Sequence, residues 1–309
     1  MSGIRTPRPP SPSFGAAWFE ALVGTAADAL VNAPTGTSAG PSTGTSPGIS
    51  GGVPAGRRAD LPGSMRVGSV GLDGQDALLI AVVADPAARL PRARGGEVGL
   101  EEGWALADVL AGAVARDQGR SLPRPIVLVV DVPSQAYGYV EELVGLHQAL
   151  AAAVAAAARA RMAGHPLVAL ITGKAVSGAF LAFGLQADRI VLLDHEDVTV
   201  QVMSRPATAR ITRRSPAELD RIAELVPATA HDGASFAALG AVHSTVRAEN
   251  PAAPTPADTA AVLTALAEAA ADARAGIGGL SSRMSSPAAR QQRAATREVR
   301  ERIAAAWRP

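Results

Sequence analysis

The chain has 309 residues, enough for one large domain or two small ones, and 48% of them are hydrophobic, which is sufficient for a substantial core. Twenty-nine basic and 28 acidic residues leave a net charge of +1, which gives no global attraction for nucleic acid or an anionic membrane. With no cysteine in the chain, disulfides, thiolate metal sites and a cysteine nucleophile are excluded.

The N-terminal part predicts a short helix followed by a linker. Within the N-terminal segment 1–33, residues 14–33 form a candidate amphipathic helix, whereas 34–56 carry no charge and almost no large apolar side chain. Burial there cannot offset the entropy of ordering, so we expect 34–64 to be a disordered linker. The chain starts without an apolar leader and contains no segment suited to span a bilayer, which predicts a soluble, cytoplasmic protein.

From about residue 65 onward, strand and helix patterns alternate. This alternation predicts an α/β fold with a largely parallel sheet, and we place this domain at 65–250. The core must be fine-grained, because the chain contains 67 alanines. The predicted strands are 66–70, 77–83, 126–130, 167–171 and 189–193, and the predicted helices are 97–117, 138–162, 179–185, 215–225, 236–246 and 255–275.

The C-terminal part, 251–309, is predicted to be a helical extension with an arginine-rich tail. From Ser281 the tail carries seven arginines and two acidic residues. Its amphipathic stretch would be marginal as an isolated helix. A solvated tail and a docking arm for an acidic partner both remain open.

Two segments that follow buried strands form the candidate site, because open α/β sheets bind ligands at the carboxyl ends of their strands. The first is 131–138, with Ser134 and Gln135, and the second is 172–180, with Gly173 and Lys174. Lys174 is the one lysine among 29 basic residues, which indicates a position where a planar guanidinium does not fit.

The second segment leads through small residues directly into a helix. The backbone N–H groups of Gly178 and Ala179 have no intrahelical acceptor there and favour negative charge. They are candidate oxyanion donors, each worth about 3–4 kcal/mol to a transition state that gains charge on oxygen. A tight strand-to-helix turn that uses small residues for packing is the alternative interpretation.

Ser177 raises a second alternative, a serine hydrolase, because its surroundings resemble a nucleophile elbow. That chemistry needs a histidine base and a carboxylate that orients it. The sequence does not assign any of the five histidines to this role: His147, His165, His195, His231 and His243. We predict no metal site, since neither His165 nor the His195–Asp197 stretch has a companion at ligand spacing.

Three segments, 91–110, 130–193 and 226–242, resemble the γ subunit of biotin-independent malonate decarboxylase, a relative of acyl-CoA carboxyltransferases. The resemblance implies a ClpP/crotonase-like core of repeated ββα units, with the amides of Gly178 and Ala179 as oxyanion donors. It places the other candidate residues along the substrate: Ser134, Gln135, Gly173 and Lys174. The sequence departs from the carboxyltransferase pattern at Ser177, where glycine is expected, and at Phe183, where histidine is expected.

The resemblance also implies partners and a reaction. A β subunit of the same fold would pair with this chain, and an acyl-carrier subunit would present the malonyl thioester on a phosphoribosyl-dephospho-CoA arm. The products would be the acetyl thioester and CO2, with no cofactor bound by this chain itself. Backbone amides suffice for such a decarboxylation, because the enolate oxygen needs donors and no side-chain nucleophile is required. The alternatives are an α-type carboxyltransferase subunit of a biotin-dependent acyl-CoA carboxylase, the serine hydrolase, and a non-catalytic scaffold for the β subunit.

Overall fold

A seven-stranded sheet forms the centre of the computed structural model, which describes residues 13–31, 61–276 and 279–307. The strand order is β1-β2-β3-β4-β5-β7, and β6 pairs with the far end of β4. β1 is antiparallel to β2 and the other pairings are parallel, which confirms the predicted sheet. The strands are β1 (Met65–Leu72), β2 (Gln75–Val82), β3 (Ile126–Val132), β4 (Leu167–Val176), β5 (Arg189–Asp194), β6 (Thr199–Gln201) and β7 (Ser244–Arg247). Most of the predicted linker, 34–64, lies outside the described residues.

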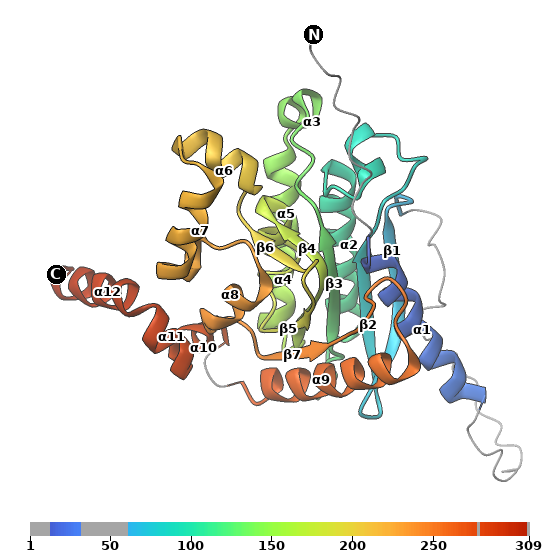
Figure 1. Ribbon diagram of the computed structural model, residues 1–309. Helices are drawn as coiled ribbons and strands as arrows, with labels where there is room; N and C mark the ends of the chain where they lie inside the picture. The colour runs from blue at the N-terminus through green and yellow to red at the C-terminus, as the bar shows by residue number, and fades with distance from the viewer. Residues whose placement is uncertain (1–12, 32–60, 277–278, 308–309) are drawn as a thin grey trace, which may run out of the picture.

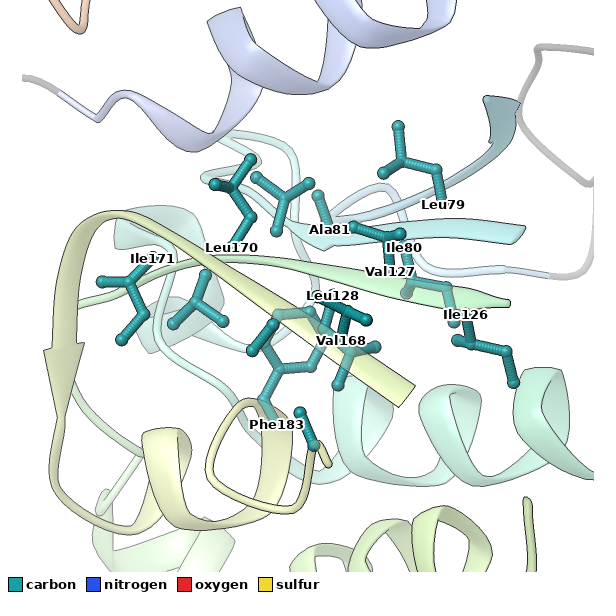
Figure 2. Close-up of a cluster of buried hydrophobic side chains, with 14 of the residues drawn as sticks. Leu79, Ile80, Ala81, Ile126, Val127, Leu128, Val168, Leu170, Ile171 and Phe183 are labelled. Carbon is teal, nitrogen blue, oxygen red and sulfur yellow. The ribbon is translucent and has the colours of Figure 1, made fainter. Parts of the chain in front are cut away.

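Helices cover both faces of this sheet (Figure 1). On one face lie α1 (Gly15–Val31) and α9 (Pro256–Arg274), and on the other lie α2 (Leu100–Arg116), α4 (Leu146–Met162) and α5 (Ser177–Phe183). Every residue of β3 is buried, as expected for a strand covered on both sides. Figure 2 shows apolar side chains of β2, β3 and β4 packed between these layers.

Small residues let the helices on one face approach closely. A Cβ added to Gly103 of α2 would lie 2.9 Å from the backbone of Ala149 in α4, so only glycine fits this crossing. The face of α4 that is buried consists largely of alanine: Ala149, Ala153, Ala156, Ala157 and Ala160. The expectation of a fine-grained core is thereby met, since short side chains fill the narrow space between the layers.

Two predicted helices differ from the structure. The helix expected over 138–162 is divided at Gly145, which has a φ of +107° and ends α3 (Tyr139–Val144) before α4 begins. The helix expected over 236–246 is wrong in its second half: α8 (Gly233–Ala238) is followed by β7. Parallel pairing with β5 outweighs the local helical pattern of this four-residue strand.

Three 3-10 turns and five further helices complete the described part of the chain. They are 3-10 turns at Pro91–Gly95, Pro227–Thr229 and Gly279–Ser281, and helices α6 (Arg205–Thr212), α7 (Pro216–Leu225), α10 (Ser282–Ser285), α11 (Pro287–Gln292) and α12 (Ala294–Ala306). In the described part of the chain, no helix combines the length and apolarity needed to cross a membrane.

Arginines of the predicted tail dock it onto the body of the protein. Arg283 donates to the carbonyl oxygens of Leu185, at 2.8 Å, and Ala187, and Arg293 donates to Leu239 O at 2.9 Å. Burial lowers the pKa of Arg283 to about 10, which still leaves it charged at neutral pH. α12 projects beyond this docked part, and its side chains are not buried (Figure 1).

Candidate functional site

The carboxyl ends of β3 and β4 bring the two predicted segments together. Val132 of β3 pairs with Ala175 of β4. Gln135 and Gly178 each follow three residues later, and the Gly178 N–H donates a hydrogen bond of 3.1 Å to Gln135 Oε1. The sequence placed both residues in the candidate site, and the structure joins them directly.

Gln135 extends from a segment whose backbone is held in place. Val98 N–H donates to Ser134 O at 3.0 Å, and Ala136 N–H donates to Val98 O at 2.8 Å. This short bridge fixes the main chain on either side of Gln135 and leaves Ser134 half-buried. The Gln135 side chain therefore reaches the start of α5 from a backbone that is hydrogen-bonded to Val98 on both sides.

The segment 172–180 was expected to be a loop, and its first half is a strand instead. β4 continues to Val176 because β6 supplies a pairing partner: Lys174 pairs with Thr199 and Val176 pairs with Gln201. Local sequence could not show this, since Gly173 and Lys174 are poor strand formers and β6 comes more than twenty residues later. The chain therefore passes from β4 to α5 without an intervening loop, and the turn is made at Ser177.

Ser177 adopts a backbone conformation that side chains disfavour. Its φ is +58°, in the left-handed region, where a residue with a Cβ is strained by about 1–2 kcal/mol. This geometry agrees with the glycine that the resemblance leads us to expect at this position. Strained residues of this kind cluster at functional sites when the surrounding structure holds them in place.

The two predicted donors differ in their surroundings. Gly178 is half-buried and lines a cavity, and its N–H is engaged by Gln135. Ala179 is completely buried. Val176, the residue that precedes α5, forms no side-chain cap, and the Gly178 N–H is capped by Gln135 from the neighbouring segment instead.

A cavity of about 240 Å3 opens beside this turn. Phe180, Leu181 and Val200 contribute apolar walls next to Ser177 and Gly178. Among the described residues, its lining includes no side chain that titrates. The complete lining is Ser177, Gly178, Phe180, Leu181, Leu185, Val200, Gln201, Val202, Pro227, Ala228, Ala230, Phe236 and Leu239.

No histidine in the described part of the chain forms a hydrogen bond with Ser177. His165 contacts Arg124 O at 2.9 Å, and His243 lies 3.7 Å from Asp272. His195 interacts with Asp197, which is two residues further along the chain. The serine–histidine pair that a hydrolase requires is thus absent from the described residues.

Gly173 and Lys174 support the turn through their backbone. A Cβ on Gly173 would lie 2.4 Å from Asp131 Oδ1, so this position accepts only glycine. Lys174 N–H donates to the same oxygen at 2.9 Å, and its ammonium group forms no ion pair with any described residue. Asp131 was assigned no role from sequence, although an acid next to the end of an otherwise apolar strand was a signal for one.

Phe183, which stands where histidine is expected, belongs to the hydrophobic core. Its side chain is completely buried, and Figure 2 shows it packed among apolar residues of the sheet. A side chain in that position has no contact with solvent. Clusters of three metal-ligating residues do not occur in the ranges that the structure covers.

Two solved structures from Pseudomonas are similar to this chain. One is a malonate decarboxylase hetero-tetramer in complex with coenzyme A, 42% identical, with a TM-score of 0.78 over 94% of this chain and 100% of the matched one. The other is a malonate decarboxylase MdcD-MdcE hetero-dimer, also 42% identical, with a TM-score of 0.77 over 96% of this chain and 100% of the matched one. The architecture is the crotonase-like fold of the carboxyltransferases, as predicted.

A curated relative and a family profile agree with these structures. The malonyl-S-ACP:biotin-protein carboxyltransferase MADD of Malonomonas rubra is 36% identical over 191 residues, which are 60% of this chain. The chain spans 64% of the length of that relative. The profile of the family described as "Malonate decarboxylase gamma subunit" matches residues 93–307. The chain therefore belongs to the family of malonate decarboxylase gamma subunits, which are enzyme subunits.

Proposed function

We propose that this chain, together with a homologous β subunit, converts a malonyl thioester on an acyl-carrier protein into the acetyl thioester and CO2. One observation carries the proposal: Gly178, whose N–H donates to Gln135 Oε1, lines a cavity that has no titratable side chain in its described lining. Such a site can stabilise an oxyanion and offers no side-chain acid or base for other chemistry. The family assignment narrows the reaction to malonate decarboxylation.

In the proposed reaction the thioester oxygen takes the position that Gln135 Oε1 holds beside the Gly178 N–H. The bond between C2 and the carboxylate breaks, and its electron pair forms the double bond of an enolate whose oxygen becomes negative. The amides of Gly178 and Ala179 stabilise that charge, which is larger in the transition state than in the substrate. C2 then takes up a proton from water to give the acetyl group, and hydroxide remains in solvent.

The apolar cavity favours the departure of CO2. A carboxylate next to Phe180, Leu181 and Val200 loses hydrating water and receives no charged partner in return, whereas neutral CO2 bears no such cost. The Ser177 side chain has no chemical role in this scheme. Ser134, Gly173 and Lys174 then serve to shape and line the substrate path.

A second subunit would cover the surface next to this site. α3, which follows Gln135, exposes Tyr139 (83%), Leu143 (74%) and Val144 (64%), an unusual group for a free surface. The relative solved as an MdcD-MdcE hetero-dimer supports a β-type partner, with an interface above about 2,000 Å2. Purification of a fully active, monodisperse monomer would contradict this part of the proposal.

The carrier of the malonyl group is a separate part of the proposal. The hetero-tetramer solved with coenzyme A supports recognition of a CoA-like group. We infer that the malonyl group arrives on the phosphoribosyl-dephospho-CoA arm of an acyl-carrier subunit, in the cytoplasm. This chain would bind no cofactor of its own.

A biotin-dependent carboxyltransferase is the second candidate, because MADD is described as transferring carboxyl groups to a biotin protein. Purified chain and β subunit should be mixed with malonyl-carrier protein, with and without a biotinylated carrier domain. Release of CO2 without biotin supports decarboxylation. Conversion that requires the biotin carrier, with carboxybiotin as product, supports the carboxyltransferase. Turnover that survives replacement of residues 173–179 would instead indicate a scaffold.

A further inference from the structure

Asp131 is a buried carboxylate that joins the N-terminal helix to the turn of the candidate site. It lies at the end of β3 and is 5% exposed. Oδ2 accepts hydrogen bonds from Ser13 Oγ at 2.9 Å, from Phe14 N–H at 2.5 Å and from Gly15 N–H at 3.0 Å. Oδ1 accepts from Lys174 N–H at 2.9 Å. The carboxylate thus caps the start of α1 and holds β4 at the same time.

The chain is shaped around this carboxylate on both sides. The register between β3 and β4 shifts at Asp131, because this one residue of β3 lies opposite three residues of β4, 172–174. A Cβ on Gly173 would lie 2.4 Å from Asp131 Oδ1, and a Cβ on Gly15 would lie 2.9 Å from Asp131 Cβ. Two glycines 158 positions apart in sequence therefore leave the space that Asp131 occupies. Irregular pairing of this kind is common beside active sites, where it redirects the chain.

Asp131 and Gln135 hold the two ends of one short segment. Asp131 accepts from the N–H of Lys174, and Gln135 accepts from the N–H of Gly178. The strained residue Ser177 lies between these two contacts, and the proposed oxyanion donor, Gly178, forms the second of them. Residues 13–15 stand outside the stretch that matches the family profile, 93–307, and yet they supply three of the four donors to Asp131.

We propose that Asp131 is a positioning residue. By binding the start of α1 and the N–H of Lys174 at once, its carboxylate fixes the backbone of the segment Lys174–Gly178 and hence the direction of the oxyanion donor. The inference rests on the proposed function for its effect on turnover. Its effect on the backbone is independent of any reaction. If Asp131 is disturbed, the donor loses alignment in the transition state, whereas the walls of the cavity stay in place. The expected signature is a lower kcat with a KM that changes little.

The test uses the full-length chain in complex with its β subunit. Asp131→Asn replaces an acceptor by an NH2 group that faces backbone donors, and we expect kcat for CO2 release to fall at least tenfold while KM changes less than twofold. Asp117→Asn is the matched control. Asp117 is buried like Asp131, and it forms an ion pair with Arg124, just before the start of β3. Because this pair is remote from the turn at Ser177, Asp117→Asn should lower the melting temperature and leave kcat within twofold.

A milder variant keeps the test valid if Asp131→Asn does not fold. Gly15→Ala crowds Asp131 from α1, whereas Gly24→Ala on the same helix meets no atom within 4 Å. We expect Gly15→Ala to lower kcat about threefold to tenfold and to speed hydrogen exchange at Lys174 N–H, with no such change in Gly24→Ala. Unchanged kcat and unchanged exchange at Lys174 in Gly15→Ala would overturn the proposal. If the wild-type complex releases no CO2, the proposed function fails, and the exchange measurement alone decides the role of Asp131.

Discussion

Removal of one backbone N–H is the sharpest perturbation of the candidate site. Gly178→Pro deletes the donor that now bonds to Gln135 Oε1 at 3.1 Å. Loss of that hydrogen bond should cost about 1 kcal/mol of folding stability. Loss of an oxyanion donor should cost roughly 3–4 kcal/mol in the transition state, or about 100-fold to 1,000-fold in kcat. The effect on turnover should therefore far exceed the effect on stability.

Gly178→Ala is the matched control, because it keeps the N–H. The added Cβ would lie 3.4 Å from the Gln135 side chain, at ordinary contact distance, and we expect kcat to stay within about threefold of wild type. CO2 release should be measured with the reconstituted complex after subunit association has been verified for each variant. Proline also constrains Ser177, so glycolic acid at position 178, which replaces the amide by an ester, provides a second route to the same deletion. Near-normal kcat in the ester variant would refute the donor role of Gly178.

Three further predictions concern separate features of the chain. Ser177→Gly should relieve the left-handed strain and stabilise the protein by up to about 1 kcal/mol, roughly 2–4 °C in melting temperature, while Ser177→Ala should retain CO2 release; an acyl-enzyme trapped at Ser177, with loss of activity in both variants, would contradict this. Arg283→Lys should lose bonds to two carbonyl groups and destabilise the chain by about 1.5–3 kcal/mol in urea unfolding, whereas Arg290→Lys on the exposed face of α11 should have no effect. Burial opposes the charge of Asp117, but the hydrogen bonds and charge of Arg124 outweigh it and lower the pKa of that carboxyl. Stability contributed by Asp117 is then present above about pH 4 and lost as the pH falls, so Asp117→Asn should flatten the acid side of a plot of unfolding free energy against pH; an unchanged slope would contradict the pairing.

Long apolar runs were the part of the fold that local sequence determined. The strand at Ile126 and the end of the alanine-rich helix α4 at Met162 were predicted at their observed positions, because burial on both faces and helix propensity leave a clear local pattern. The extension of β4 to Val176 and the strand β7 were missed, since each depends on a partner strand that is distant in sequence. The division of the chain into domains stays a prediction.

The candidate site was predictable in its residues and not in its contacts. Gly178 and Gln135 were both singled out from their positions after buried strands, but the bond between them follows from the tertiary arrangement. Asp131 was passed over because its donors at Ser13, Phe14 and Gly15 lie 116 to 118 residues away. Sequence patterns report which groups follow a strand, whereas long-range packing decides which of them meet.

The use of main-chain amides has a consequence for how this site would respond to mutational scanning. Every residue except proline carries an N–H, so alanine at 178 or serine at 179 would leave the proposed donors in place. Sensitive positions would instead be those that hold the main chain, above all Asp131 and Gly173. A mutational scan of the whole chain should show that activity tolerates substitutions at the donor residues and is lost at the residues that hold their backbone. Relatives could therefore differ in side chain at the donor positions and keep the same chemistry.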